Sequence, residues 1–293
     1  MADEVYCPYC DTKAKFLFHA QDLNEQITEQ LFDYYKCPND GIIFLSPVPE
    51  NLADYYPTSY YQIPSDNNDD NEFTPDPLHQ FKIDILEKYS NGLKLLEIGS
   101  GRGDFLYLSR KVGFDVTAIE MDKDSCDFMQ NHLKIPVIHT TDTLKSLTET
   151  GQYDVIAMWH VIEHLPNVWD ILHEIPKHLN DDGILILTGP NPYSIQFRIF
   201  REAWYHLDAP RHVVMIPLPL LSNDLASYGL HLADIITDDD GSKLLDHFGW
   251  HITWERQINS PIYKIKRYIS KKLFKQVNRL QEKPFYLAIF RKS

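Results

Sequence analysis

The sequence predicts an α/β protein in which a doubly wound parallel sheet follows a small module of a different kind. Beyond residue 76, short apolar runs alternate with stretches of helical length, which is the pattern of βαβ units with helices on both faces of a sheet. A glycine-rich turn follows the first of these runs, where a strand would pass into a helix. The first 45 residues instead hold three of the four cysteines between short aromatic-rich runs.

Size and charge narrow the classes of function. The 293 residues have room for one medium catalytic domain and a small accessory module. A net charge of -14 argues against a nucleic-acid partner, because phosphate contacts need a basic surface. No apolar run approaches the roughly 20 residues of a membrane-spanning helix, and the start of the chain resembles no signal peptide. The few cysteines do not form a secreted disulfide framework, so we expect a cytoplasmic protein.

Changes in composition divide the chain into three expected segments. Residues 1–64 form the cysteine-containing module and a tyrosine-rich connector, and residues 65–75 form an acidic linker without periodicity. Residues 76–293 form the catalytic domain, which begins with an amphipathic helix from Leu78 to Tyr89. A later helix is expected near Pro219–Tyr228. Strands are expected at Lys15–Phe18, Gly41–Leu45, Leu93–Ile98, Val116–Ile119, Val137–Ile138, Val155–Trp159, Ile184–Leu187, Leu230–Ile236 and Phe285–Phe290.

The glycine-rich turn contains Gly99, Gly101 and Gly103 and is flanked by Glu97 and Asp104. Glycine lets the chain turn tightly and lets a ligand approach the N-terminus of the next helix. The spacing G-x-G-x-G differs from the dinucleotide fingerprint, whose third glycine comes one residue later. Two carboxylates would oppose a pyrophosphate but suit a ligand that carries an ammonium and a sulfonium. The alternative interpretation is a tight turn that binds no ligand.

Further motifs point to one family of enzymes. Glu120 ends the next predicted strand, where a carboxylate would hold ribose hydroxyls. Glu97–Gly103 resembles the first motif of class I S-adenosylmethionine-dependent methyltransferases, Trp159–His164 their signature after the fourth strand, and Asn180–Gly183 the turn into the fifth. The resemblance implies a Rossmann-like sheet of seven strands, the last one antiparallel, and S-adenosylmethionine as cofactor. It also implies that the cofactor contacts Glu97, Gly99, Ser100, Gly101, Gly103, Glu120, Met121, Asp142, Trp159 and His160.

Two turn-like knuckles carry the N-terminal cysteines, with Cys7 and Cys10 in the first and Cys37 and Asp40 in the second. Thiolates at this spacing can point at one ion, and two such pairs make a tetrahedral structural zinc site. Asp40 stands where a fourth cysteine is expected, and either this carboxylate or His19 could be the fourth ligand. The arrangement resembles the zinc ribbon ahead of the catalytic domain in some bacterial methyltransferases, including sugar methyltransferases. The alternative is a ribbon without zinc that aromatic packing holds together.

The acceptor is expected outside the carboxyl ends of the strands, beside the segments that follow the fourth and fifth strands. Trp204–His212, after the fifth, resembles a W-x-x-x-D-x-P-R-H stretch of a broad bacterial methyltransferase subgroup. We predict the general base among His212, His206 and Asp208, since imidazoles and carboxylates can be tuned to accept a proton near neutral pH. In the alternative interpretation, Asp208 and Arg211 pair to fold the loop and the histidines pack it.

A second cluster follows the fourth strand and contains His160, Glu163 and His164. It resembles a cluster in ubiquinone-type O-methyltransferases that is associated with a divalent metal, although those enzymes carry glutamate where this chain has His160. The alternative interpretation is that Glu163 and His164 orient the strand-to-helix turn, while Trp159 borders the adenine pocket.

The predicted acceptor is a small molecule. The family likeness implies a nucleotide-sugar or glycan hydroxyl first and a quinone-like or other metabolite second. A nicotinamide-dependent oxidoreductase would need the other glycine spacing, and a non-catalytic adaptor that binds the cofactor is the rival outside enzymes. A basic stretch at 263–278 predicts an amphipathic helix, which either makes a weak contact with an anionic membrane surface or packs on the domain.

Overall fold

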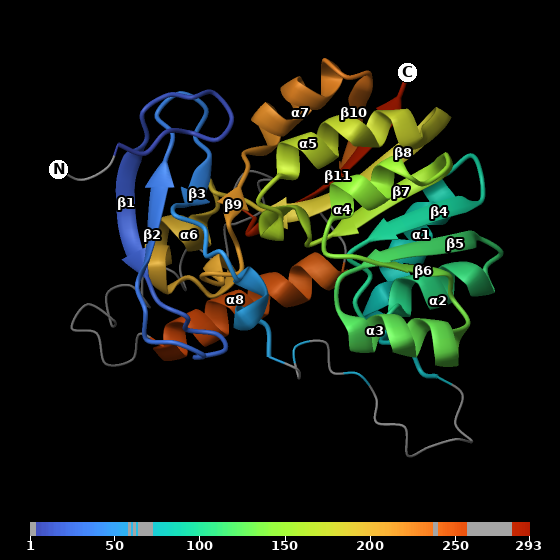
Figure 1. Ribbon diagram of the computed structural model, residues 1–293, viewed down its shortest axis with the longest axis horizontal. Coiled ribbons are helices and arrows are strands. Elements are labelled where there is room, and N and C mark those ends of the chain that lie inside the picture. The colour runs from blue at the N-terminus through green and yellow to red at the C-terminus, as the bar shows by residue number, and fades with distance from the viewer. Residues whose placement is uncertain (1–3, 58–59, 61–62, 64–72, 237–239, 257–282) are drawn as a thin grey trace.

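The computed structural model describes residues 4–57, 60, 63, 73–236, 240–256 and 283–293. Its larger sheet contains seven strands, which are β4 (Lys94–Ile98), β5 (Asp115–Glu120), β6 (Val137–His139), β7 (Tyr153–Trp159), β8 (Leu179–Pro190), β10 (Leu230–Ile236) and β11 (Phe285–Lys292). The spatial order is β10-β11-β8-β7-β4-β5-β6 (Figure 1). β4 to β8 run parallel, and β11 pairs antiparallel with β8 and β10. The predicted seven-stranded, doubly wound sheet with an antiparallel last strand is confirmed.

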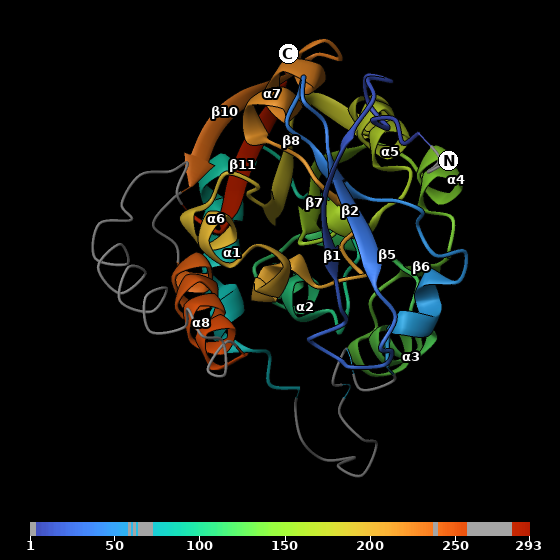
Figure 2. The ribbon, with the colours of Figure 1, turned by 90° about the vertical axis from the view of Figure 1, so that its left-hand side faces the viewer.

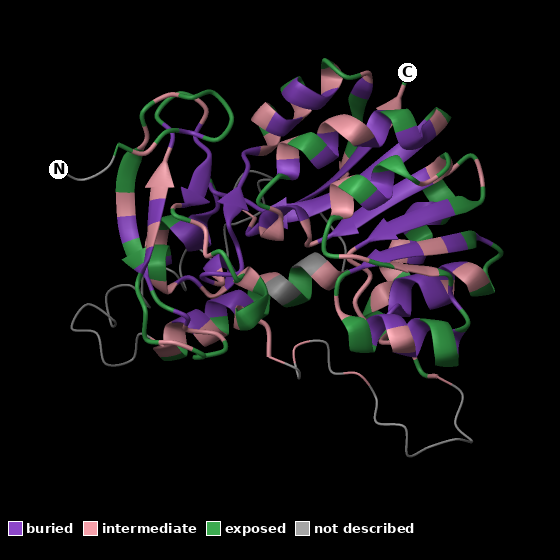
Figure 3. Ribbon diagram, in the orientation of Figure 1, coloured by how far each residue is buried: buried purple, intermediate pink, exposed green. Residues whose placement is uncertain are grey.

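Neighbouring residues of the central strands point into two cores, one on each face of the sheet. Leu95 shares a core with apolar residues of α1 (Gln80–Tyr89), α2 (Asp104–Lys111) and α3 (Lys123–Phe128). Leu96 shares the other core with α4 (Thr143–Thr148), α5 (Val168–Glu174) and α7 (Leu218–Ala226). This alternation follows from the two-residue period of a strand. The central strands are therefore apolar on both faces and buried along most of their length (Figure 3).

A second, smaller sheet stands beside the first (Figure 2) and contains β1 (Lys15–Ala20), β2 (Phe32–Lys36), β3 (Ile43–Leu45) and β9 (Val214–Met215). All of its strand pairs are antiparallel. β1 and β3 agree with the predicted strands, whereas β9 comes from the chain just after Trp204–His212. A strand of two residues has no readable period, so its pairing with β3 could not be expected from the sequence. The core of this sheet is continuous with one core of the larger sheet.

The sequence shows no clear helical periodicity of apolar residues in two of the helices, which are α6 (Ile195–Phe200) and α8 (Asp240–Arg256). α8 contains two glycines, which weaken a helical pattern. Its glycine at 249 faces the ring of His206, and a Cβ there would overlap that ring. Thr253 is fully buried, and its hydroxyl accepts a hydrogen bond from the amide of Tyr205 at 3.0 Å. Tertiary packing against the Trp204–His212 segment therefore stabilises the helical conformation of α8.

Two predicted segments fall on residues that the structure does not describe. The basic helix at 263–278 lies wholly outside the described residues, and so does most of the acidic linker at 65–75. Both stay predictions. Within the residues that the structure describes, no helix is both long and apolar enough to cross a lipid bilayer.

Candidate active site

The glycine turn joins β4 to α2 and has the conformation that its sequence requires. Gly99, Gly101 and Gly103 have φ angles of 71°, 51° and 84°, a region that glycine adopts without a steric penalty. A Cβ on Gly99 would come within 2.6 Å of the side chain of Val161, and one on Gly103 within 2.7 Å of Met129. The turn therefore needs glycine both for its backbone angles and for close packing against neighbouring segments.

Glu120 ends β5 beside this turn and is buried. Its carboxylate accepts hydrogen bonds from the amides of Gly101, Met121 and Asp122 at 2.7, 2.7 and 2.8 Å. Burial raises the pKa of Glu120 even though these amides lower it. The three bonds hold the carboxylate in one place at the carboxyl edge of the sheet.

A cavity of about 750 Å³ opens at this edge. Most of the predicted cofactor residues line it: Gly99, Glu120, Met121, Asp142, Trp159 and His160. Asp142 also caps α4, because its carboxylate accepts from the amide of Lys145 at 3.1 Å. The segment before the larger sheet contributes one wall of the cavity: Glu50, Leu52, Ala53, Tyr56 and Tyr60.

A smaller polar pocket of about 320 Å³ adjoins the cavity and shares Tyr60, Gly99 and Trp159 with it. Three of the four remaining predicted cofactor residues line this pocket, namely Glu97, Ser100 and Gly101. Gly103 lines neither space and instead packs against Met129.

Asp104, predicted to flank a cationic ligand together with Glu97, is already paired. Arg102 donates to it from Nε and Nη2 at 2.8 and 2.7 Å, and the amide of Asp76 donates at 2.8 Å. Burial would raise the pKa of Asp104, but these donors hold it below its usual value. Asp104 therefore carries a cationic partner of its own, whereas Oε2 of Glu97 has no hydrogen-bond partner among the described residues.

Glu163 lies among three histidines behind the cavity wall. Its carboxylate is fully buried, and neither oxygen has a hydrogen-bond partner among the described residues. Nδ1 of His160 lies 3.6 Å and Nε2 of His212 4.0 Å from Oε1 of Glu163. Burial alone would raise the pKa of Glu163, but the contact with His160 and the imidazoles of His212 and His164 hold it below its usual value.

His164 completes the cluster. Its Nδ1 lies 2.8 Å from the hydroxyl of Tyr56 and 3.1 Å from the carbonyl of Arg211, and burial lowers its pKa to about 4. Glu163, His164 and His212 each offer a ligand atom, all within 4.8 Å of one another. Carboxylate and imidazole are ligands of divalent transition metals, and the unpartnered carboxylate fits such an ion. These three residues could therefore hold a divalent cation.

The three residues predicted to be catalytic do not line the cavity among its described residues. Asp208 accepts two hydrogen bonds from Arg211 at 3.0 and 2.7 Å, which hold its pKa below its usual value despite burial. His206 is buried between Trp204 and Phe285, with ring centroids at 5.4 and 4.5 Å. Nε2 of His212 lies 4.0 Å from Oε1 of Glu163, and neither residue is among the described lining residues. The loop-folding interpretation of Asp208 and Arg211 therefore describes this segment, and the cavity's imidazoles come from the segment after β7.

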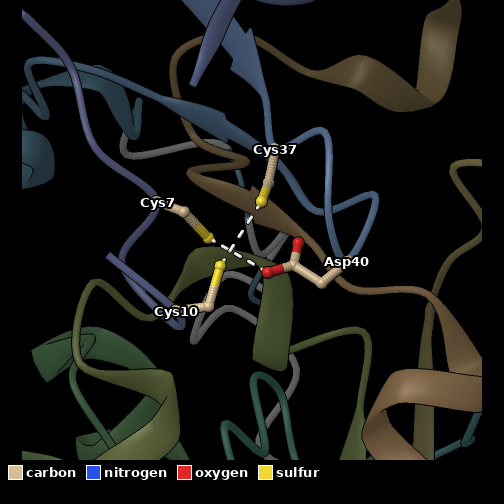
Figure 4. Close-up of side chains that lie close together, drawn as sticks. All are labelled: Cys7, Cys10, Cys37 and Asp40. Atoms are coloured by element: carbon tan, nitrogen blue, oxygen red, sulfur yellow. Dashed lines mark hydrogen bonds between the residues drawn. The ribbon is translucent and has the colours of Figure 1, made fainter. Parts of the chain in front are cut away.

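Cys7, Cys10, Cys37 and Asp40 converge as the spacing predicts (Figure 4). Sγ of Cys7 lies 3.3 Å from Oδ2 of Asp40, and the sulfurs of Cys10 and Cys37 lie 3.5 Å apart. All four ligand atoms lie within 4.8 Å of one another, and the cysteines form no disulfide. Three thiols and one carboxylate at this separation fit a tetrahedral zinc ion. His19 lies outside the cluster, because its Nδ1 pairs with Asp33 at 2.6 Å.

The cysteine-containing module is attached to the larger sheet's helices by specific contacts. Tyr9, between the first two cysteines, packs against Trp169 of α5 with ring centroids 4.5 Å apart, and its hydroxyl donates to Asp224 of α7 at 3.1 Å. Tyr34 of β2 donates its hydroxyl to the carbonyl of His212 at 2.7 Å. These contacts keep the module beside the cavity that residues 50–56 help to line.

Comparison with known proteins identifies the family. A family model described as a methyltransferase domain matches residues 71–235, more than half of the chain. Curated relatives named ubiquinone biosynthesis O-methyltransferase are 31% identical over 126 residues in Glaesserella parasuis and 32% over 115 in Rickettsia typhi. These alignments cover 39% and 38% of this chain and 53% and 46% of the relatives, so the chain spans about half the length of the curated relatives it matches.

Solved structures agree on the fold. An S-adenosylmethionine-dependent methyltransferase from Archaeoglobus fulgidus superimposes with a TM-score of 0.51 at 18% identity, covering 73% of this chain and 93% of that one. A putative sarcosine dimethylglycine methyltransferase from Galdieria sulphuraria gives 0.51 at 17% identity, covering 73% and 84%. The matched domain shows that the chain belongs to the methyltransferase domain family, and its seven-stranded sheet has the fold of the S-adenosylmethionine-dependent methyltransferase from Archaeoglobus fulgidus.

Proposed function

We propose that this enzyme transfers the methyl group of S-adenosylmethionine to a hydroxyl of a small, largely uncharged acceptor of the phenol or quinol type. The lining of the large cavity carries the proposal. Beside the predicted cofactor residues, the walls include the aromatic and apolar side chains of Tyr56, Tyr60, Val161 and Leu165 and the half-buried imidazole of His164. Apolar and aromatic walls with few polar groups are typical of sites for small organic molecules.

The charges around the cavity argue against a nucleotide-sugar acceptor. Glu50, Glu120 and Asp142 line the cavity, and its described lining residues include no lysine or arginine. A diphosphate is normally bound by such cations and would be repelled by the carboxylates. The curated relatives, which are ubiquinone biosynthesis O-methyltransferases, also support the quinone-like acceptor. We therefore place it ahead of the nucleotide-sugar that the family likeness implied.

The lining residues suggest how the cofactor lies. We propose that Glu120 binds the ribose hydroxyls, Asp142 lies by the adenine, and Glu97 faces the amino acid end. The sulfonium would then lie where the two spaces meet, beside Trp159 and His160. Methyl transfer is an in-line displacement, so the enzyme mainly has to align the acceptor with this carbon.

We propose His160 as the base that takes the acceptor's proton and Glu163 as its positioning carboxylate. The His160 side chain is 35% exposed, lines the cavity and lies 3.6 Å from Glu163. Its φ of 57° is uncommon for a residue other than glycine, and its amide donates to Oγ1 of Thr188 at 2.6 Å. Such backbone outliers, held by their surroundings, concentrate at active sites. A divalent cation on Glu163, His164 and His212 would supply the same chemistry by acidifying the acceptor hydroxyl.

An acceptor screen tests the proposed function. With purified enzyme and methyl-labelled S-adenosylmethionine, we expect label to enter catechols, other phenols and quinols, with kcat/KM at least about 100-fold above that for nucleotide-sugars, because the latter bring a diphosphate into an acidic cavity. Reactions without acceptor and without enzyme are the controls. Preferential labelling of nucleotide-sugars would contradict the proposed acceptor and leave only the methyltransferase activity standing.

We also propose that the N-terminal module binds one structural zinc ion through Cys7, Cys10, Cys37 and Asp40. The supporting observations are the donor set and its spacing in Figure 4. Because two knuckles far apart in sequence would share the ion, zinc would contribute directly to the stability of the smaller sheet.

The zinc proposal predicts about one zinc per chain in metal analysis of the purified protein. Asp40→Ala should lower the zinc affinity, whereas Asp40→Cys should restore or raise it, because thiolate is a strong zinc ligand. Cys126→Ser is the matched control, since this buried thiol lies in α3 away from the cluster. Zinc-free protein, or equal zinc content in the Asp40→Ala and Cys37→Ser variants and the wild type, would contradict the proposal.

A further inference from the structure

Another pocket lies where the smaller sheet meets the segment that follows β8. Its volume is about 530 Å³, and its lining comes from β1, from the end of β2 with the second cysteine knuckle, and from Tyr193. The described lining residues include two lysines, Lys15 and Lys36, and no aspartate or glutamate. None of them also lines the large cavity or the small polar pocket beside the glycine turn. This positively charged pocket is therefore separate from the candidate active site.

The two lysines stand opposite each other on neighbouring strands. β1 and β2 lie side by side (Figure 2), and their antiparallel register pairs Lys15 with Lys36. Lys36 comes two residues after Tyr34, so both side chains lie on the same face of the sheet, and Tyr34 is buried in the core. Nζ of Lys36 lies 5.7 Å from the ring centroid of Tyr193. The lysine pair therefore extends from the face of the smaller sheet that packs against the rest of the protein.

This arrangement of charges is unfavourable unless an anion lies beside it. Like charges directly opposite each other in an antiparallel pair are destabilising, because their Cβ atoms are only about 5 Å apart. Neither lysine forms an ion pair with a carboxylate among the described residues. Asp40 is close in sequence, but its carboxylate accepts from the thiol of Cys7 and the amide of Ile42 at 3.3 and 3.0 Å. The pair of lysines therefore indicates a ligand that brings negative charge.

The charge and the size of the pocket together fit a phosphate monoester. Such a group carries a charge of about -1.5 to -2 at pH 7 and offers three strong acceptor oxygens. Two ammonium groups can donate to these oxygens at the same time, since each carries three donors. Leu17, Pro38 and Tyr193 also line the pocket and supply an apolar wall for the organic part of the ester.

We propose that Lys15 and Lys36 together bind the phosphate of a phosphate monoester, in a ligand site separate from the catalytic cavity. The proposal depends neither on the identity of the acceptor nor on that of the cofactor. The monoester has two possible sources, a soluble phosphorylated metabolite and the headgroup of phosphatidic acid in a lipid bilayer. Both sources present the same dianionic group to the lysine pair.

Two small ligands of different charge test the proposal on the full-length protein with S-adenosylhomocysteine present. Isothermal titration would compare ethyl phosphate, a monoester, with diethyl phosphate, whose single charge leaves one lysine without a partner. We expect ethyl phosphate to bind at least about 10-fold more tightly. Lys15→Met and Lys36→Met should each weaken its binding by about 10- to 100-fold, the range of a hydrogen bond to a charged group. Lys13→Met is the matched control, because this exposed lysine of the same segment pairs with Glu4.

Thermal unfolding shows whether the lysine variants fold and separates ligand binding from a structural role. Without ligand, Lys15→Met should unfold at the same temperature as the wild type or at a higher one, because the substitution relieves the repulsion between the two lysines. Ethyl phosphate should raise the unfolding temperature of the wild type and of Lys13→Met, but not that of Lys15→Met.

Vesicles identify the source of the phosphate. Sedimentation with phosphatidylcholine vesicles that contain phosphatidic acid, lost in Lys15→Met and Lys36→Met, would assign the site to the lipid. Binding of ethyl phosphate without binding to these vesicles would assign it to a soluble ester. Binding to neither, or ethyl phosphate binding that both variants leave unchanged, would overturn the proposal. So would loss of zinc from the variants at unchanged ethyl phosphate affinity, which would show that the lysines balance the charge of the thiolate cluster.

Discussion

Replacement of Arg211 by methionine should lower the free energy of unfolding by about 3–5 kcal/mol, the usual result of removing one partner from a buried ion pair. The Arg211 side chain is fully buried. It donates to Asp208 through two bonds, to Asp22 at 2.7 Å and to the carbonyl of Tyr55 at 2.9 Å. Without it, two buried carboxylates lose their counterion. Urea unfolding of both proteins measures the difference.

The matched control is Arg198→Met, which removes an exposed arginine from α6 and should change the stability by less than about 0.5 kcal/mol. Combining Arg211→Met with Asp22→Asn and Asp208→Asn should recover part of the loss, because the uncompensated charges are then gone. Equal unfolding free energies for the Arg211→Met and Arg198→Met variants would show that the buried network contributes nothing to stability.

This network also explains how the connector that lines the large cavity is held in place. Asp22 belongs to the N-terminal module, Tyr55 to the connector that lines the cavity, and Asp208 to the loop after β8. One side chain therefore ties three segments that are distant in sequence. The W-x-x-x-D-x-P-R-H likeness marks this segment, and its physical role in this chain is to attach the module to the catalytic domain.

The parts of the fold that depend on short-range pattern could be predicted. β4 to β8 are apolar runs because both faces of a parallel sheet are buried, and the turn after β4 needs its glycines for the backbone angles. The convergence of the Cys7 and Cys10 thiols could likewise be predicted, because it depends only on their spacing within one turn. Each of these signals is contained within about ten residues of sequence.

The parts that depend on long-range packing could not be predicted. His212 lies 4.0 Å from Glu163 across 49 residues of sequence, and β9 is only two residues long. The pairing of Asp104 with Arg102 is different, because an arginine two residues away is visible in the sequence. That local pair indicates from the sequence alone that Asp104 has a cationic partner.

The second large effect is expected at His160. His160→Gln should lower kcat by about 100- to 10,000-fold, the contribution of a positioned general base, while the affinity for S-adenosylhomocysteine stays within about 3-fold. Single-turnover methyl transfer to a phenolic acceptor measures the first quantity and isothermal titration the second. His231→Gln, an exposed histidine in β10, is the matched control. Unchanged turnover in His160→Gln would remove this residue from the proton transfer.

Glu163→Gln separates a positioning role from a purely structural one. If Glu163 acts through His160, its loss should lower kcat while the affinity for S-adenosylhomocysteine stays within about 3-fold. Structural damage alone would weaken the binding of S-adenosylhomocysteine as well. Because His160 supplies the base, chelator-treated enzyme that has been reloaded with one zinc ion per chain should keep its activity. Loss of activity that Mg²⁺ or Mn²⁺ restores and Zn²⁺ does not would instead assign Glu163, His164 and His212 to a catalytic metal ion.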